Sequence, residues 1–535
     1  MKWTQITDPL HHLGLSALVA ALPIAFIFWA LIIRKMKGHT VCLLTALAGM
    51  LIAIIVYGMP VKLAVLSLAD GALFGLFTIC WIIMGVLFLY HLTVESGQFA
   101  IIRHFMASIT TDKRLQALLI AFAFGSFLEG AAGFGAPVAI TAAMLTGLGF
   151  EPLYAAGICL IANTAPVAFG SIGIPITVAS QVSGLPEMAI SQMVGKTLPL
   201  LSLLLPFYLV FITVGFKKTW EVWPAVLVAG SSFAIVQFVT ANYISPMLPD
   251  VLSGLTSIIC MIVLLKYWRP GPHAPQTASG YTSLQIVRAW SPFMIMTLLV
   301  ILWGVPAIKD QLNTVGQLKA TIAGLHNAIL RADGSPLVIK PFTFSWLANA
   351  GTAMLFAAIL SIPIIGADGA MAAKAFRLTI HQLKFPALTI TSVMGFAYVV
   401  NNSGMSITMA LALATTGTLF PFFSPILGWL GVFLTGSDTS SNALFCKLQY
   451  NSAVAIGVDP VVTVAANVSG GVTGKMISPQ SIAIAATAVG LVGKESDIFR
   501  FTAKHSFIML AIVCILTTLQ AWLIHLFHIK HIFGL

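Results

Sequence analysis

Residues 124–150 read FGSFLEGAAGFGAPVAITAAMLTGLGF and carry one carboxylate, Glu129, in an otherwise apolar segment. The carboxylate is followed closely by residue types that interrupt a helix, namely Gly130, Gly133, Gly135 and Pro137. Backbone groups freed by an interruption cannot face lipid, so they are buried in protein or line a watered cavity. A carboxylate at such a place is a candidate functional group. The alternative is a glycine-rich packing face with Glu129 directed to the membrane surface.

The composition around this segment is that of a membrane protein. The 535 residues are 59% hydrophobic and 8% charged, with a mean hydropathy of +0.98, whereas soluble domains are about 25% charged. Since a helix needs about 20 apolar residues to cross a bilayer, the length allows about 12–14 crossings. We therefore expect an all-α polytopic membrane protein.

The charged residues and the cysteines exclude other classes. The formal net charge is +11, but the basic residues are spread over short loops between apolar runs, which indicates a positive-inside topology and no nucleic-acid partner. The six cysteines occur singly, without the spacing of a metal site, so we expect core residues and neither disulfides nor metal ligands.

The basic loops also predict the orientation. A first helix over about residues 12–33 is followed by Arg34, Lys35 and Lys37, which places its end in the cytoplasm and the N-terminus outside. The number of crossings between Leu115 and Phe216 stays open, and residues 371–385 read as an amphipathic helix at the cytoplasmic surface or an ordinary loop. Further crossings are expected near residues 40–57, 71–92, 222–244, 251–267, 292–305, 346–365 and 507–527.

The chain divides into two membrane halves. The first half covers residues 1–270 and the second covers residues 291–535, joined by a cytoplasmic linker at 271–290 beside a Pro/Gly-rich run. Each half contains a region of interrupted, re-entrant segments, at about residues 124–180 and about residues 433–490.

These two regions resemble each other. ANTAPVAFGSIGIP begins at Ala162 and ANVSGGVTGKMISP begins at Ala466, and both place Asn, Gly and Pro at the same spacing. Each follows an acid-Pro pair and, before it, an acid in a run of small residues, Glu129 or Asp438. Paired interrupted segments point to a transporter binding site, where helix N-termini compensate an anionic substrate. Chance similarity between Gly/Ala-rich segments is the alternative.

Four motifs connect the chain with a known family: FLEGAAGFGAPVAI, ANTAPVAFGSIGIP, NNSGMS and TGSDTSSNALF. Together they resemble the bacterial L-lactate permease family over nearly the whole chain. The resemblance implies secondary active import of L-lactate, D-lactate and glycolate across the inner membrane by proton symport, with no cofactor. It implies, more remotely, the two inverted-repeat halves of the larger ion transporter superfamily.

A 2-hydroxymonocarboxylate needs N–H groups or a cation for its carboxylate and a polar side chain for its hydroxyl. Because burial disfavours a charged carboxyl, Glu129 first and Asp438 second are candidates for proton coupling. A structural ion pair between Asp438 and Lys475 is the alternative. The candidates for substrate binding are polar side chains of the interrupted regions, namely Asn163, Thr164, Ser437, Ser441, Asn442, Asn467 and Lys475, followed by Asn401 and Asn402.

Other functions remain as alternatives. A sodium-coupled dicarboxylate carrier is the main one, while a channel usually needs rings of ligands from several subunits. An enzyme is not indicated, because the chain has no HExxH or GxSxG motif, and GGVTGKM lacks the first glycine of a P-loop. The expected partners are the small-molecule substrate and the lipid bilayer, and a homodimer is compatible with the sequence.

Overall fold

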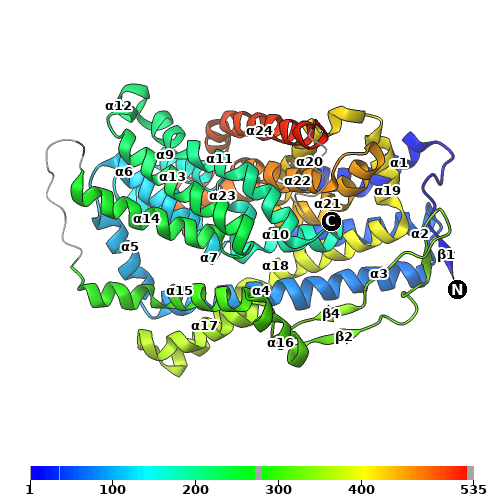
Figure 1. The fold of residues 1–535 in the computed structure, drawn as a ribbon, viewed down its shortest axis with the longest axis horizontal. Helices are drawn as coiled ribbons and strands as arrows, with labels where there is room; N and C mark the ends of the chain where they lie inside the picture. Colours follow the sequence, from blue (N-terminus) through cyan, green and yellow to red (C-terminus); the bar gives the residue numbers. More distant parts are fainter. Residues whose placement is uncertain (1, 35, 134, 269, 271–279, 527–535) are drawn as a thin grey trace.

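The computed structural model describes residues 2–526 apart from 35, 134, 269 and 271–279. Eleven helices in this part of the chain are long and apolar enough to cross a membrane, or 12 if the bent pair α9–α10 counts as one span. The fold is the all-α polytopic bundle that the sequence predicts (Figure 1). The number of spans lies at or just below the lower end of the expected 12–14.

The first half of the chain holds the elements up to α14. They are β1 (Trp3–Thr4), α1 (Leu13–Phe28), α2 (Gly38–Ile55), α3 (Val61–Phe74), α4 (Cys80–Glu95), α5 (Gln98–Ser108), α6 (Lys113–Gln116), the π-helix η3 (Ala117–Phe124), α7 (Gly125–Ala131), α8 (Ala136–Gly147), α9 (Pro152–Ala162), the 3-10 turn η4 (Val167–Phe169), α10 (Gly170–Ser183), α11 (Glu187–Val214), α12 (Phe216–Trp220), α13 (Trp223–Val239), the π-helix η5 (Thr240–Ile244) and α14 (Pro249–Tyr267).

The second half holds the remaining elements. They are α15 (Ser283–Gly304), α16 (Pro306–Gly316), β2 (Leu318–Ala320), β3 (Ile329–Leu330), β4 (Phe342–Phe344), α17 (Ala350–Ile365), α18 (Gly369–Ser403), α19 (Met405–Ala414), α20 (Phe420–Thr435), α21 (Asp438–Ile456), α22 (Pro460–Gly474), the 3-10 turn η7 (Lys475–Ile477), α23 (Pro479–Ala488) and α24 (Glu495–Leu526). Short π or 3-10 turns at Trp29–Ile33, Gly75–Ile79 and Gly417–Leu419 extend or join helices.

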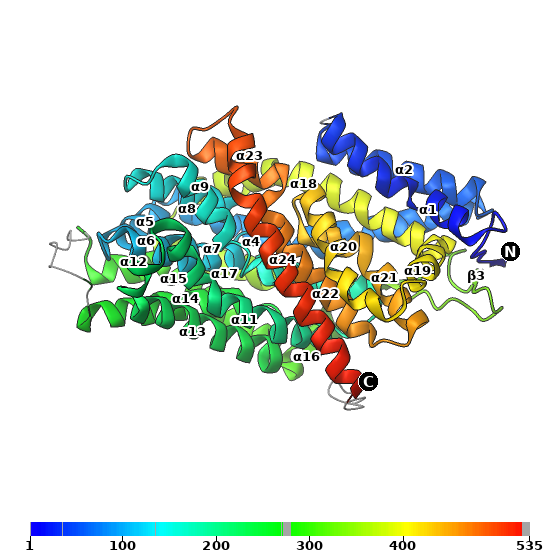
Figure 2. The same ribbon diagram turned by 90° about the horizontal axis from the view of Figure 1, so that it is seen from above.

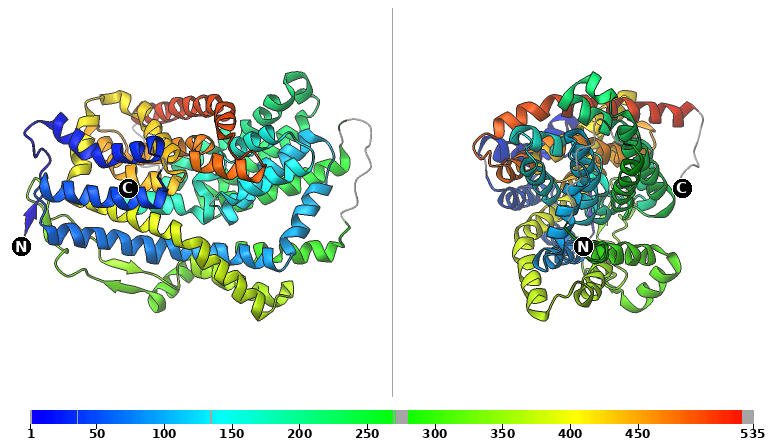
Figure 3. Two further views of the ribbon diagram at one scale, coloured as in Figure 1. Left: turned by 180° about the vertical axis from the view of Figure 1, so that it is seen from behind. Right: turned by 90° about the vertical axis from the view of Figure 1, so that its left-hand side faces the viewer.

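The long helices lie along the longest axis of the molecule, and α24 crosses them obliquely (Figure 2). At one end of this axis β1 pairs with β3, whereas β2 pairs with β4 further along, where Phe344 of β4 lies against Phe77 and Trp81. The N-terminus lies at that end and the start of α15 at the other (Figure 3). This arrangement agrees with long helices that cross a bilayer and polar segments at its two surfaces.

Two segments differ from the sequence prediction. Residues 371–385 are helical, but they form the first half of the 35-residue helix α18, which continues through Pro386, instead of a separate surface helix. The predicted linker at 271–290 lies partly outside the described residues, and α15 already begins at Ser283. The six cysteines are free thiols, of which five are buried and Cys260 is partly buried.

Glycines allow the helices to approach closely, as is usual where lipid supplies no hydrophobic drive between helices. A Cβ atom added to Gly428 of α20 would lie 1.9 Å from the carbonyl oxygen of Asn467 in α22, and one added to Gly470 would lie 2.1 Å from that of Pro425. Because the obstructing atoms are backbone atoms, they cannot rotate out of the way.

We expect Gly428→Ala to destabilise the protein by about 1–3 kcal/mol, because a methyl group must force α20 and α22 apart. The measurement is thermal unfolding in detergent. The matched control is Gly147→Ala in α8, where a Cβ atom meets nothing within 4 Å. Equal unfolding temperatures for the two variants would contradict this account of the α20–α22 packing.

Candidate functional site

Four helices begin around one cavity of about 150 Å³, which we call the charged cavity. Residues at the starts of α8, α10, α21 and α23 line it, among them Gly135, Gly170, Ser437 and Gln480. The first backbone N–H groups of a helix have no partner within it, and the helix dipole places partial positive charge there. Four such ends at one cavity favour an anionic ligand.

Each of these helices begins where the chain is interrupted. The pair α9–α10 is bent by 63°, and Ser171, Ile172 and Gly173 adopt positive φ within the bend. Before α8 the chain turns through Gly133 and Gly135, both with positive φ. The interruptions predicted from the Gly- and Pro-rich motifs therefore occur, and they meet at the charged cavity.

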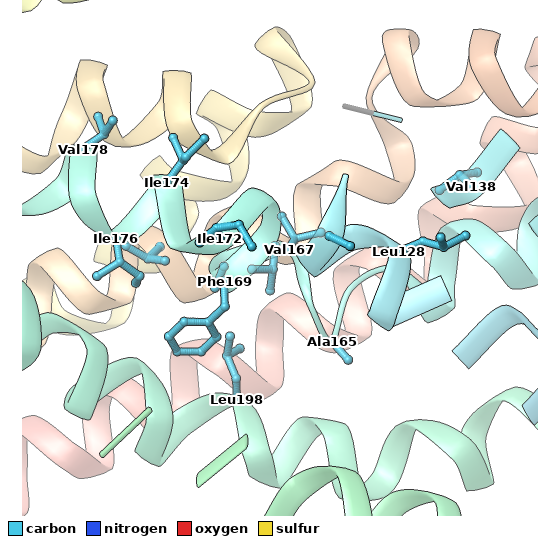
Figure 4. Close-up of a cluster of buried hydrophobic side chains, with 14 of the residues drawn as sticks. Leu128, Val138, Ala165, Val167, Phe169, Ile172, Ile174, Ile176, Val178 and Leu198 are labelled. Carbon is cyan, nitrogen blue, oxygen red and sulfur yellow. The ribbon is translucent and has the colours of Figure 1, made fainter. Parts of the chain in front are cut away.

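Apolar side chains hold the interrupted segments in place. Figure 4 shows Phe169 of η4 lying against Leu198 of α11, while Leu128 of α7 and Val138 of α8 lie at the other end of the same cluster. The backbone groups freed at the bends are thus enclosed by protein, as the absence of water in a bilayer requires.

An ion pair lies in the wall of the charged cavity. Lys475 donates to Oε1 of Glu129 at 2.6 Å, and Oε2 of Glu129 accepts a hydrogen bond from Asn163 at 3.0 Å. The exposed fractions are 8% for Lys475 and 3% for Glu129. The alternative that pairs Lys475 with Asp438 is therefore wrong, since the lysine's partner is Glu129.

A chain of amide side chains leads away from the cavity. Asp438 accepts from Asn442 at 3.3 Å, Asn442 accepts from Asn467 at 2.9 Å, and Asn467 accepts from Gln449 at 3.2 Å. Asn442 also donates to the carbonyl oxygen of Pro175, in the bent helix α10. This network joins the two similar regions of the sequence.

The remaining candidates have different environments. Ser437 caps α21 by accepting from the backbone of Ser440, and Ser441 donates to the carbonyl oxygen of Gly428. Thr164 is buried, and its hydroxyl has no hydrogen-bond partner among the described residues. The predicted site residues therefore form three groups. The wall of the charged cavity contains Glu129, Lys475, Ser437 and Asp438, and the layer behind this wall contains Asn163, Asn442 and Asn467. The third group, Thr164 and Ser441, lies at separate packing positions.

Asn401 and Asn402 do not belong to the charged cavity. They line a second cavity of about 380 Å³, together with Asp70, Tyr398, Lys447 and the loop at 337–343. Asn402 donates to Ser67 at 3.0 Å. The helices α10, α18 and α21 contribute residues to both cavities, so the two spaces lie along the same three helices.

The acid-Pro pairs have a local role. Glu151 accepts from the backbone N–H groups of Leu153 and Tyr154 and caps α9, while Asp459 accepts from Val461 and caps α22. Both prolines occupy the first helical turn, which is a common helix start. This part of the similarity between the two regions thus marks equivalent helix starts.

The predicted site residues include neither Asp250 nor Gln480, although Gln480 belongs to the polar run that contains Lys475. Asp250 is buried beside Gly130, where a Cβ atom would lie 2.8 Å from the Cβ of Asp250. In sequence, Asp250 follows Pro249 and reads as an ordinary helix start, so only its complete burial distinguishes it. The described residues contain no group of three or more His, Cys, Asp or Glu side chains able to hold a metal ion.

A membrane-spanning helical bundle with interrupted helices that meet at a charged, buried cavity defines a solute transporter. The sequence comparisons identify the transporter family. The profile of the L-lactate permease family matches residues 16–524, and the chain belongs to this family. Family membership also establishes that the protein is a permease and no enzyme.

Curated relatives extend over the full length. An L-lactate permease of Bacillus subtilis (strain 168) is 52% identical over 567 residues, covering 98% of this chain and 100% of the relative. The glycolate permease GlcA of Escherichia coli (strain K12) is 51% identical over 553 residues, covering 98% of each chain. An L-lactate permease of Salmonella typhimurium is 50% identical over 546 residues, again covering 98% of each chain.

Proposed function

We propose that this protein imports L-lactate and the related 2-hydroxymonocarboxylates D-lactate and glycolate by proton symport across the bacterial inner membrane. The observation that carries the proposal is the buried Lys475 at a cavity where four helices begin. The cation and the helix starts suit one carboxylate, and Ser437 and Gln480 in the wall offer partners for a hydroxyl group. Permeases named for lactate and for glycolate are about equally similar to this chain.

The size of the charged cavity supports a small substrate. Its volume of about 150 Å³ lies below the roughly 300–1,000 Å³ of pockets for drug-sized ligands. A three-carbon acid with one negative charge matches this space and its single ammonium group better than a dicarboxylate does.

The ion pair suggests how substrate and proton are coupled. A substrate carboxylate that binds Lys475 replaces Oε1 of Glu129, which now lies 2.6 Å from the same ammonium group. The displaced carboxylate is then buried without a counter-charge, so it favours binding a proton. Asp438, whose Oδ1 has no hydrogen-bond partner among the described residues, is the second proton candidate of the same wall.

The two cavities support alternating access, in which the substrate site opens to one side at a time. Pro386 of α18 lines the charged cavity and Tyr398 lines the second one, about 18 Å apart along the helix for 12 residues. Loop 337–343 at the second cavity overlaps the end of the polar segment 309–340, which the count of crossings from the first helix places outside. We therefore assign the second cavity to the outer side, with the N-terminus also outside.

The decisive experiment is uptake of labelled L-lactate into proteoliposomes with an imposed inward pH gradient, with and without sodium. We expect accumulation without sodium, competed by D-lactate and glycolate but not by succinate. Sodium dependence together with competition by succinate would contradict the proposal and favour a sodium-coupled dicarboxylate carrier. Product analysis after uptake should recover unchanged L-lactate.

A further inference from the structure

Asp250 is the most completely buried carboxyl group near the site, with an exposed fraction of 1%. Neither Oδ1 nor Oδ2 has a hydrogen-bond partner among the described residues. An ionised carboxylate in such surroundings loses its hydration and gains no hydrogen bond in return, so the protonated form is favoured.

The charged groups that act on Asp250 come from the functional site. They are Glu129 of α7, which repels a negative charge on Asp250, and Lys475, which attracts one. The segments packed most extensively against α14 are α7, α13, η3 and η5, and α13 and η3 contain no charged residue. Tyr243 of η5 is 73% exposed and faces away from the interior. Burial therefore acts first on the charge state of Asp250, and Glu129 and Lys475 are the charged groups that add to this effect.

The position of Asp250 within α14 makes its ionised form attainable. Asp250 lies in the first turn of this 19-residue helix, whose N-cap residue Leu248 provides no side-chain hydrogen bond. The unpaired N–H groups and the dipole of a helix N-terminus stabilise a negative charge there. A group that prefers a proton, yet tolerates its loss, is suited to bind and release a proton.

We propose that Asp250 and Glu129 share the transported proton, and that Asp250 takes it up before the substrate binds. This inference rests on the proposed proton symport and adds a second proton-binding residue to it. In the proton-loaded state that precedes substrate binding, Glu129 is ionised against Lys475 and the proton is on Asp250, whereas the form that returns after release holds the proton on neither carboxyl. When a substrate carboxylate takes Lys475, the O–H bond of Asp250 breaks and one forms on Glu129, and the helix N-terminus compensates the new carboxylate.

The charges balance over such a cycle. Without proton and substrate, Glu129 and Asp250 carry two negative charges and Lys475 one positive charge, so the group has a net charge of −1. With one proton and one substrate anion bound, the net charge is again −1. The loaded form and the form that has released both proton and substrate thus carry the same charge across the membrane. The cycle therefore moves no net charge.

The test uses Asp250→Asn, which keeps the shape of a protonated aspartate but cannot release a proton. We expect accumulation driven by the pH gradient to fall at least tenfold, while exchange of external labelled L-lactate for internal L-lactate remains. Infrared spectra of the substrate-free protein should lose one protonated-carboxyl band in Asp250→Asn and none in Glu129→Gln. The exposed Asp310→Asn is the matched control and should behave as the wild type.

Accumulation by Asp250→Asn at the wild-type level would overturn the inference, because a permanently neutral residue at position 250 would then suffice for proton-coupled uptake. An unchanged carboxyl band would also overturn it, because Asp250 would then not hold the proton. Asp250→Ser provides a second neutral replacement should the asparagine variant not be recovered as a monodisperse protein. A wild type that fails to accumulate L-lactate with a pH gradient would instead contradict the proposed symport. The infrared bands remain readable in that case, so the two failures are distinguishable.

Discussion

Replacing Lys475 by glutamine should abolish L-lactate uptake and destabilise the protein by about 3–5 kcal/mol. The ammonium group is the counter-charge of Glu129 at 2.6 Å in a wall that is almost closed to water. Removing one member of a buried pair leaves the other charge uncompensated, which costs that amount. Uptake is lost independently, because the substrate carboxylate loses its cation. Thermal unfolding in detergent and proteoliposome uptake measure the two effects.

The chain offers a matched control for this substitution. Lys374 pairs with Glu95, also at 2.6 Å, but its side chain is 65% exposed, and exposed pairs contribute about 0–1 kcal/mol. Lys374→Gln should therefore leave stability and uptake nearly unchanged. The double variant Glu129→Gln/Lys475→Gln should recover most of the stability without recovering uptake. An equal loss of stability in Lys475→Gln and Lys374→Gln would show that burial does not govern the contribution of the Lys475–Glu129 pair.

Glu129→Gln should separate substrate binding from proton coupling. Glutamine cannot compete for Lys475 as a carboxylate does, so L-lactate should bind about tenfold more tightly, a change of about 1.4 kcal/mol. Glutamine also cannot take up the proton, so accumulation driven by a pH gradient should disappear while exchange of L-lactate for L-lactate continues. Binding by calorimetry and the two transport assays together test this prediction.

Glu495→Gln at the partly exposed start of α24 is the control and should retain coupled accumulation. Unaltered accumulation by Glu129→Gln would remove Glu129 from the coupling mechanism. Loss of both binding and exchange would mean that Glu129 maintains the structure of the substrate site. The proposal that the substrate displaces Glu129 from Lys475 would then be wrong.

The parts of the fold that follow from local chemistry could be predicted from the sequence. Apolar runs of sufficient length became helices, and the Gly- and Pro-rich motifs around Glu129 and Asp438 became interruptions, because both outcomes depend on neighbouring residues alone. Helix ends were less accurate. Residues 371–385 have a polar face that suits a membrane surface, yet they continue into α18, since Pro386 interrupts the hydrogen bonding without ending the helix.

The candidate site depended on contacts between distant residues, which sequence patterns do not contain. Lys475 and Glu129 were both predicted, but their pairing was not, because nothing in either motif selects one acid over the other. Asn401 and Asn402 are as polar as the residues that line the charged cavity, but they lie at the second cavity. Asp250 was not predicted as a site residue, because a single acidic residue after a proline at a helix start is common on protein surfaces.

The ion pair joins residues 346 positions apart in the chain, and this distance matters during biosynthesis. At about 5–20 residues per second, Glu129 leaves the ribosome about 20–70 s before Lys475 does. Throughout that interval the first half of the protein must enter the membrane while the carboxyl group of Glu129 cannot yet pair with Lys475. The nascent chain therefore either carries Glu129 protonated or keeps it in contact with water until the last quarter of the protein has been made.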